Sequence, residues 1–174
     1  MSKHLQDLVL PDILAHVTSI ESLYEILESG YLKSRSETGA DRGLSSIDKG
    51  DPNYVYLSLN VENKLIGKVK LSLSSSILNE RNDYYLNTDW FYGVTNQSLN
   101  STQLNTWLSR VRGPGEILFK NKIPLNKYLK EIIIPQLSKD IINLIKKSDT
   151  KVNLHEVNMN KIPEEYRDMI KIVY

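Results

Sequence analysis

Residues 111 to 125, with the sequence VRGPGEILFKNKIPL, place one acid between a sharp turn and an apolar run. Glu116 directly follows a Gly-Pro-Gly turn, and the apolar residues after it predict a short strand, EILF. The run LKEIIIP predicts another strand soon afterwards. A lone acid at a strand start is more often a surface residue, but a tight turn can also aim its carboxylate into a cleft. The rest of the chain must decide between these readings.

Alternating apolar and polar residues predict further strands along the chain. LAHV at residues 14–17 and YVYLSLN at 54–60 are rich in strand-forming residues. In KVKLSLSSSIL, residues 68–78, the alternation puts Val69, Leu71 and Leu73 on one face. Short predicted strands outnumber helices. The fold class we expect is therefore α+β, with a mostly antiparallel sheet and flanking helices in one domain that spans residues 1–174.

One helix signal follows the first predicted strand. Thr18 and Glu21 are spaced as a capping box, so we expect Thr18 to be the N-cap and Gly30 to supply the left-handed residue at the C-terminus. SKDIINLIKK and TQLNTWLSRV predict further amphipathic helices. Residues 33–53 are mostly polar with several glycines, and they predict a long loop, while residues 79–101 predict a second irregular region.

Composition excludes several kinds of chemistry. The 174 residues are 40% hydrophobic and 25% charged with a net charge of +1, which argues neither for nor against a nucleic-acid partner. The chain has no cysteine, so a thiolate nucleophile, a disulfide and a zinc–thiolate site are excluded. Three widely spaced histidines do not favour a metal site. Neither a signal peptide nor a membrane-spanning run is evident, so we expect a cytoplasmic protein that needs no metal and no membrane.

Besides Glu116, few residues are candidates for a role in catalysis or ligand binding. His16 lies at the end of the first predicted strand, and Tyr54, Tyr56 and Ser58 share one face of the second. Taken singly, such a histidine is more often structural, and such a polar stripe is more often the wet face of a sheet. Their order along the chain, however, matches a known pattern.

The chain resembles the ADP-ribosyltransferase superfamily, and within it the bacterial DNA-modifying toxins of the DarT type. AHVTSIESLYEILESGYL resembles the opening strand and helix of that family, in which a histidine and a small hydroxyl residue, here His16 and Thr18, hold the nicotinamide ribose. YVYLSLN and KVKLSLSSSIL resemble the next core strands, and GEILFKNKIPLNKYLKEIII resembles the strand with the catalytic acid. The resemblance covers roughly residues 13–135, and four weak motifs in the right order make it moderately specific. It implies an NAD-dependent mono-ADP-ribosyltransferase with a split sheet and Glu116 as the catalytic acid.

The chemistry of NAD cleavage suits these residues. Breaking the nicotinamide–ribose bond creates an oxocarbenium-like centre, which a carboxylate such as Glu116 stabilises. The flat nicotinamide ring needs an aromatic partner, for which we choose Tyr56, beside Ser58 on the same strand face. Backbone groups around His16 and Val17 would hold the nicotinamide amide. The pyrophosphate needs a cation, and Arg35 and Arg42 both lie in the loop where the resemblance implies one; their spacing does not choose between them.

The acceptor is harder to predict. Trp107, Arg110 and Arg112 precede Glu116, and a tryptophan with two arginines suits single-stranded nucleic acid. A core Trp107 with solvated arginines is an equal alternative. Pro114 stands where arginine-modifying relatives carry an acid or amide, which argues against arginine as acceptor. We expect nucleic acid as the acceptor, with a protein acceptor as the alternative, and the resemblance also implies an antitoxin or immunity partner.

Two other functional classes share this fold. A tRNA 2′-phosphotransferase needs several arginines to grip the RNA phosphate, and the sequence does not place such a set. A module that binds without catalysis is the other alternative. Labelled NAD offered with DNA, RNA and protein distinguishes all of these.

Overall fold

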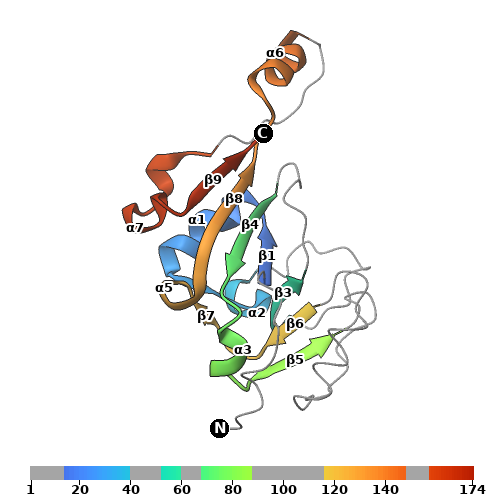
Figure 1. Ribbon diagram of the computed structural model, residues 1–174, viewed down its shortest axis with the longest axis vertical. Coiled ribbons are helices and arrows are strands. Elements are labelled where there is room, and N and C mark those ends of the chain that lie inside the picture. Colours follow the sequence, from blue (N-terminus) through green and yellow to red (C-terminus); the bar gives the residue numbers. More distant parts are fainter. Residues whose placement is uncertain (1–13, 40–51, 60–67, 88–115, 148–156) are drawn as a thin grey trace.

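The computed structural model describes residues 14–39, 52–59, 68–87, 116–147 and 157–174. Seven strands form one sheet: β1 (Leu14–Thr18), β3 (Val55–Leu59), β4 (Val69–Leu73), β5 (Tyr84–Asn87), β6 (Glu116–Phe119), β8 (Leu129–Pro135) and β9 (Ile170–Val173). Their spatial order is β5, β6, β3, β1, β4, β8, β9 (Figure 1). All neighbours run antiparallel except β8 and β9, which are parallel. The expected α+β class with a mostly antiparallel sheet is therefore confirmed.

Helix α1 (Ile20–Ser29) follows β1 and covers one face of the sheet. Its N-cap is Ser19, whose hydroxyl accepts a hydrogen bond from the Ser22 backbone at 3.1 Å. The expected cap at Thr18 is therefore wrong, because Thr18 is still paired in β1 and the extended backbone continues one residue further. The left-handed C-cap at Gly30 is confirmed by its φ of 70°.

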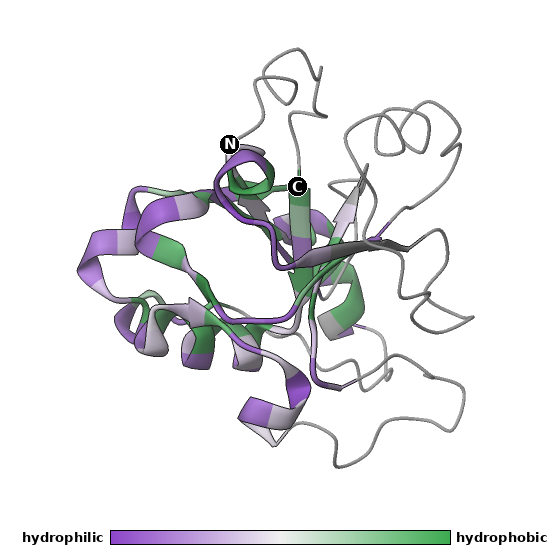
Figure 2. Ribbon diagram, turned by 90° about the horizontal axis from the view of Figure 1, so that it is seen from below, coloured by the Kyte–Doolittle hydropathy of each residue, from purple (hydrophilic) through white to green (hydrophobic). Residues whose placement is uncertain are grey.

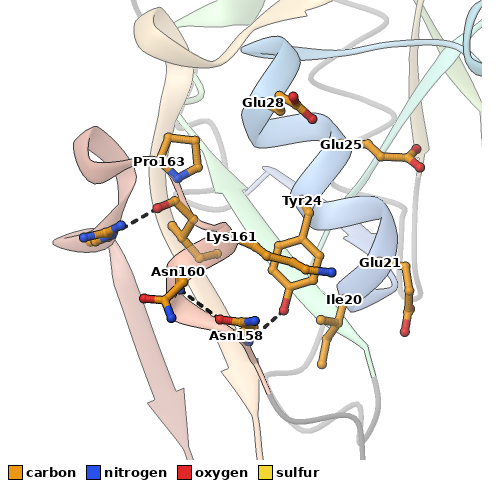
Figure 3. A pocket seen from close by; sticks show the side chains of 11 residues that line it. Ile20, Glu21, Tyr24, Glu25, Glu28, Asn158, Asn160, Lys161 and Pro163 are labelled. Carbon is orange, nitrogen blue, oxygen red and sulfur yellow. Dashed lines mark hydrogen bonds between the residues drawn. The ribbon is translucent and has the colours of Figure 1, made fainter.

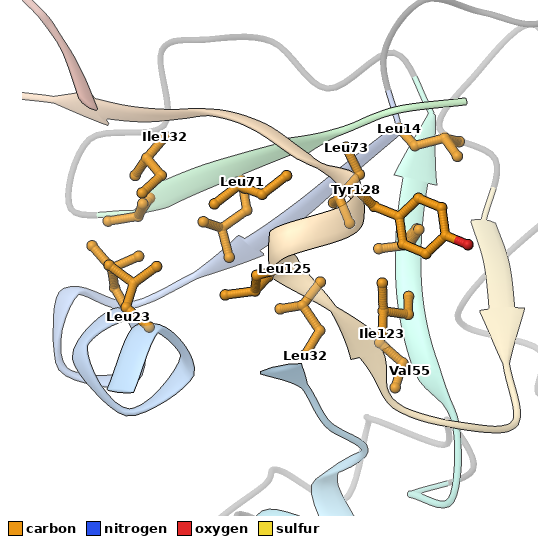
Figure 4. Close-up of a cluster of buried hydrophobic side chains, with 14 of the residues drawn as sticks. Leu14, Leu23, Leu32, Val55, Leu71, Leu73, Ile123, Leu125, Tyr128 and Ile132 are labelled. Atoms are coloured by element: carbon orange, nitrogen blue, oxygen red, sulfur yellow. The ribbon is translucent and has the colours of Figure 1, made fainter. Parts of the chain in front are cut away.

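The hydrophobic core lies between α1 and one face of the sheet. Leu23 of α1 faces Leu71 of β4 and Ile132 of β8, all with 0% exposure (Figure 4). Val69, Leu71 and Leu73 point to this face, as their alternation predicted. Figure 2 shows hydrophobic and hydrophilic residues interspersed along the helices, as expected where one helical face packs on the core. Because the odd-numbered positions of β4 enter the core, its even-numbered positions lie on the opposite face of the sheet.

Several short elements escaped the sequence analysis. The segment predicted as a loop contains helix α2 (Arg35–Thr38) near its start. Ser34 and Glu37 form a capping box at the N-terminus of this helix. The second irregular region contains β5, and its polar start includes the end of α3 (Ile77–Glu80). β2 (Tyr31–Leu32) pairs with β7 (Ile123–Pro124), and α5 (Leu125–Tyr128) follows. Each of these elements is at most four residues long, too short to show a period in the sequence.

A polar cluster joins the start of β5 to the end of β6. The Arg81 guanidinium bonds both carboxylate oxygens of Asp83 and lies 4.8 Å from the centre of the Phe119 ring. Asp83 also accepts from the Asn121 side-chain amide at 2.9 Å. Phe119 ends the strand that Glu116 begins, so this cluster holds the strand that carries the predicted acid.

The C-terminal part adds α6 (Lys139–Lys147), η2 (Met159–Lys161), α7 (Glu164–Arg167) and the edge strand β9. α6 lies beyond the ends of β8 and β9, away from the sheet (Figure 1). Two apolar residues of this helix, Ile141 and Leu144, are exposed. Among the described residues, no helix combines the length and the apolar character that crossing a membrane requires.

Candidate active site

Glu116 is not a surface residue. Its exposure is 6%, and it alternates along β6 with Ile117, which is in the hydrophobic core cluster. The carboxylate therefore leaves the sheet on the face opposite to the core. Removing a carboxylate from water costs free energy unless its surroundings are arranged for it, so a buried acid at this position marks a candidate site.

The strand register extends Glu116 into a row of residues across the sheet. Glu116 of β6 is opposite Ser58 of β3, Ser58 is opposite Ala15 of β1, and Ala15 is opposite Ser72 of β4. On the other side of Glu116, Asn87 of β5 is its partner. Directly opposed residues in a sheet project to the same face, so the row forms one band across five strands.

Tyr56 joins this band at its centre. It lies two residues before Ser58 on β3 and opposite Leu118 of β6, so it projects to the same face as Ser58 and Glu116. Neighbouring strands are about 4.8 Å apart and alternate residues on one strand are about 7 Å apart. The register therefore brings Tyr56, Ser58 and Glu116 together on one face of the sheet.

His16 lies where two central strands separate. β1 and β3 are in register only at Leu14 and Ala15, whereas β1 stays paired with β4 as far as Thr18. Beyond Ala15, the His16 Nδ1 atom is 2.9 Å from the Tyr56 carbonyl oxygen. A carbonyl only accepts, so Nδ1 carries the proton in this contact and Nε2 of the neutral ring is left as an acceptor. His16 thus joins the first strand to the strand that carries Tyr56 and Ser58.

Burial keeps the His16 ring neutral. Desolvation lowers the pKa of His16 below its usual value of 6.5, and the hydrogen bond to the Tyr56 carbonyl opposes this effect only in part. Near neutral pH the ring therefore presents an Nε2 acceptor rather than a positive charge. Such an acceptor suits a ligand hydroxyl better than a ligand phosphate.

The other predicted contacts lie near this point or outside the described residues. Val17 is opposite Lys70 and so lies on the face of Glu116. Thr18 is opposite Val69 and His16 is opposite Leu71, so these two side chains leave β1 on the face of the core residues. Arg35 is the first residue of α2 and is half-buried. The remaining predicted residues fall in segments that the structure does not describe: Arg42, Trp107, Arg110 and Arg112.

Sequence reasoning missed two polar residues of the same sheet face, Lys70 and Ser72. Both are 4% exposed and alternate with core residues of β4. The alternation KVKLSLS contained a signal for them, since it put Lys70 and Ser72 on the face away from the core. Only the register showed that this face is the one that carries Ser58 and Glu116.

A separate cavity of about 890 Å³ lies on the outer side of α1 (Figure 3). The Tyr24 hydroxyl accepts from the Asn158 backbone there at 2.8 Å, and the Lys161 ammonium lies over the Tyr24 ring. The glutamates of α1 line one side of this cavity. It contains none of the predicted site residues, so the candidate site rests on the row of Glu116 and not on this cavity. Within the described part of the chain, no three acidic or histidine side chains converge as metal ligands.

Comparison with solved structures finds similar ones among DarT proteins. No protein-family model and no curated protein matches the sequence. The DarT protein of Thermus sp. 2.9 in complex with NAD+ is similar in structure, with a TM-score of 0.53 and 13% identity over 94% of this chain and 96% of that chain. The same protein in complex with carba-NAD+ has a TM-score of 0.50 and 15% identity over 79% and 88%. This chain therefore has the ADP-ribosyltransferase fold of DarT, as its sequence resemblance implied.

Proposed function

We propose that this protein is an NAD-dependent ADP-ribosyltransferase that modifies a macromolecule, with Glu116 as its catalytic acid. The observation that carries the proposal is the burial of Glu116 opposite Ser58, on the sheet face away from the core. The shared fold supports the reaction class. The DarT structures in complex with NAD+ and carba-NAD+ support NAD as the substrate.

In this reaction the bond between nicotinamide and the ribose anomeric carbon breaks, and neutral nicotinamide leaves with the bonding electrons. The Glu116 carboxylate stabilises the positive charge that develops on the sugar. The nucleophile of the acceptor forms the new bond to the anomeric carbon, and its proton passes to Glu116. One side chain thus serves both the bond cleavage and the transfer.

The neighbouring residues hold the substrate in our proposal. His16 accepts a hydrogen bond from a ribose hydroxyl through Nε2, because its Nδ1 proton is already donated to the Tyr56 carbonyl. Tyr56 stacks on the nicotinamide ring, while Ser58, Val17 and Thr18 supply polar contacts to the amide and the ribose. Arg35 or Arg42 pairs with the pyrophosphate.

For the acceptor we propose single-stranded nucleic acid. Trp107, Arg110 and Arg112 stand directly before Glu116 in the sequence, and they combine a stacking ring with two phosphate-binding groups. An enzyme with this activity would act as a toxin in the cytoplasm of a bacterial cell, held in check by an antitoxin or immunity partner.

Labelled NAD tests the proposal. The purified protein is incubated with NAD labelled in the adenosine part, together with single-stranded DNA, RNA and cell-lysate protein, and Glu116→Gln serves as the inactive control. We expect label in a nucleic-acid fraction, and free nicotinamide in at least the same amount, because NAD hydrolysis releases it as well. Label in protein alone would overturn the acceptor. Transfer to none of the fractions, with no nicotinamide release, would overturn the enzymatic function.

A further inference from the structure

The Ser72 hydroxyl is buried without a hydrogen-bond partner. Ser72 is 4% exposed, and none of the described residues bonds its Oγ atom. Ser34, the other buried serine of the described residues, is fully engaged, since it accepts from the Glu37 backbone and bonds the Glu37 carboxylate. A buried hydroxyl without a partner destabilises the folded protein. Such a cost requires an explanation, and a ligand that supplies the missing bond is one.

Ser72 belongs to the row that contains Glu116. It is opposite Ala15, which is opposite Ser58, which is opposite Glu116. Three strand spacings separate Ser72 from Glu116, about 14 Å between their backbones. Between the two serines stands only the methyl group of Ala15, which is fully buried like Ser72 itself. The register of β4 with β8 also shifts directly after Ser72, and such irregularities are frequent beside functional sites.

The charges beside Ser72 favour an anion. Lys70 lies two residues earlier on the same face and is 4% exposed. Glu131 is opposite Ser72, and Lys171 of β9 donates to its carboxylate. Because Lys171 pairs with Glu131, the positive charge on this face comes from Lys70. Burial lowers the pKa of Lys70, and the Glu131 carboxylate opposes that effect, which favours the charged ammonium.

We propose that Ser72 and Lys70 form a subsite for phosphoryl oxygens, on the same sheet face as Glu116. This proposal rests on the proposed ADP-ribosyl transfer and specifies where the phosphate-bearing part of a substrate lies. A hydroxyl donor beside an ammonium suits phosphoryl oxygens, which accept several hydrogen bonds and carry negative charge. Two sources share this chemistry, the diphosphate of NAD and a phosphodiester of the acceptor.

The test uses Ser72→Ala and Lys70→Met in the full chain. Lys171→Met is the matched control, because Lys171 bonds the same Glu131 but its side chain is 67% exposed. Calorimetric titrations measure the dissociation constants for NAD, inorganic pyrophosphate, a single-stranded oligonucleotide and nicotinamide riboside, which lacks a diphosphate. We expect Ser72→Ala to weaken pyrophosphate about fivefold and Lys70→Met to weaken it about tenfold or more. Lys171→Met should bind pyrophosphate with the wild-type dissociation constant. The dissociation constant for nicotinamide riboside should be the same in all variants.

The two sources separate in the other titrations. If the same variants weaken NAD binding as much as pyrophosphate binding, the subsite holds the NAD diphosphate. If they weaken only oligonucleotide binding to that extent, the subsite holds the acceptor. Dissociation constants that equal the wild-type values for all phosphate-bearing ligands overturn the proposal. Equal losses in Lys171→Met also overturn it, since they would reflect general charge.

Folding and function are checked separately. Because the Ser72 hydroxyl has no bond to lose, Ser72→Ala should keep or raise the Tm of the free protein, and a fall of about 4 °C or more would show a structural role and overturn the proposal. Lys70→Gln replaces Lys70→Met if the latter does not fold. If the wild type transfers no ADP-ribose yet binds pyrophosphate through Ser72 and Lys70, the proposed function fails and the subsite stands. If the Ser72 and Lys70 variants transfer ADP-ribose and bind every phosphate-bearing ligand as the wild type does, the subsite fails and the proposed function stands.

Discussion

Ser58 stands directly opposite Glu116 in the register of β3 and β6, and the two side chains leave the sheet on the face away from the core. Because side chains alternate along a strand, a slip of one residue would turn Glu116 toward the core and Ile117 away from it. The register is fixed by Ile117 and Phe119, which are both fully buried. The same apolar packing that stabilises the sheet therefore determines where the carboxylate lies.

Glu116→Gln should lower ADP-ribosyl transfer by about two orders of magnitude or more while leaving the fold intact. The amide is nearly the same size, but it carries no charge to stabilise the sugar cation. Transfer of labelled ADP-ribose and the circular dichroism spectrum are the measurements. Glu25→Gln, an exposed position on α1, is the matched control and should keep full activity. Wild-type transfer by Glu116→Gln would end the catalytic assignment.

Replacing Tyr56 should separate its ring from its hydroxyl. Stacking on nicotinamide needs only the ring, so Tyr56→Phe should bind NAD nearly as well as the wild type, whereas Tyr56→Leu should lose about 1–2 kcal/mol of binding free energy. Calorimetric titration with NAD measures both. Lys130→Ala, at an exposed position of β8, is the control for an unrelated change. Equal affinity of the Phe and Leu variants would place the nicotinamide ring elsewhere.

His16 should make the stability of the protein depend on pH. Its pKa is lowered in the folded state by burial, so below about pH 6.5 the unfolded chain binds a proton that the folded protein does not. The contribution of His16 is therefore present above pH 6.5 and is lost as the pH falls toward the folded pKa. Urea unfolding from pH 8 to pH 5 should show a smaller fall in the free energy of unfolding for His16→Gln than for the wild type. Parallel curves for the two proteins would mean that the His16 pKa is not lowered.

Salt should reveal the nature of the acceptor. If Arg110 and Arg112 bind phosphates, the Michaelis constant for an oligonucleotide should rise steeply between 50 and 200 mM salt, by about tenfold or more for several phosphate contacts. Replacing both arginines by alanine should raise that constant and flatten the salt dependence. Slow hydrolysis of NAD by water needs no such contacts and should change little. A salt dependence that is the same in wild type and double variant would exclude these arginines from the acceptor site.

The sequence by itself determined the strands and the helix that build the frame of the site. Alternation located β3 and β4, apolar runs located β6 and β8, and the helical period with Gly30 located α1, because burial of one face or of a whole run leaves that pattern in the sequence. The motif order along the chain also pointed to the fold that DarT shares. Elements of four residues or fewer, such as α2, α5 and β5, left no period to detect, and the cap of α1 moved from Thr18 to Ser19 because β1 remained paired through Thr18.

Only the tertiary structure decided which residues meet. Ala15, Ser58, Ser72 and Glu116 come from four separate parts of the chain, and no local pattern relates them. The hydrogen-bonded register between strands aligns them in one row, and the separation of β1 from β3 beyond Ala15 places His16 against the Tyr56 carbonyl. Strand pairing is set by burying apolar side chains that are far apart in the sequence, so the packing of Leu71, Ile117 and their neighbours fixes the face on which Glu116 and Ser72 lie.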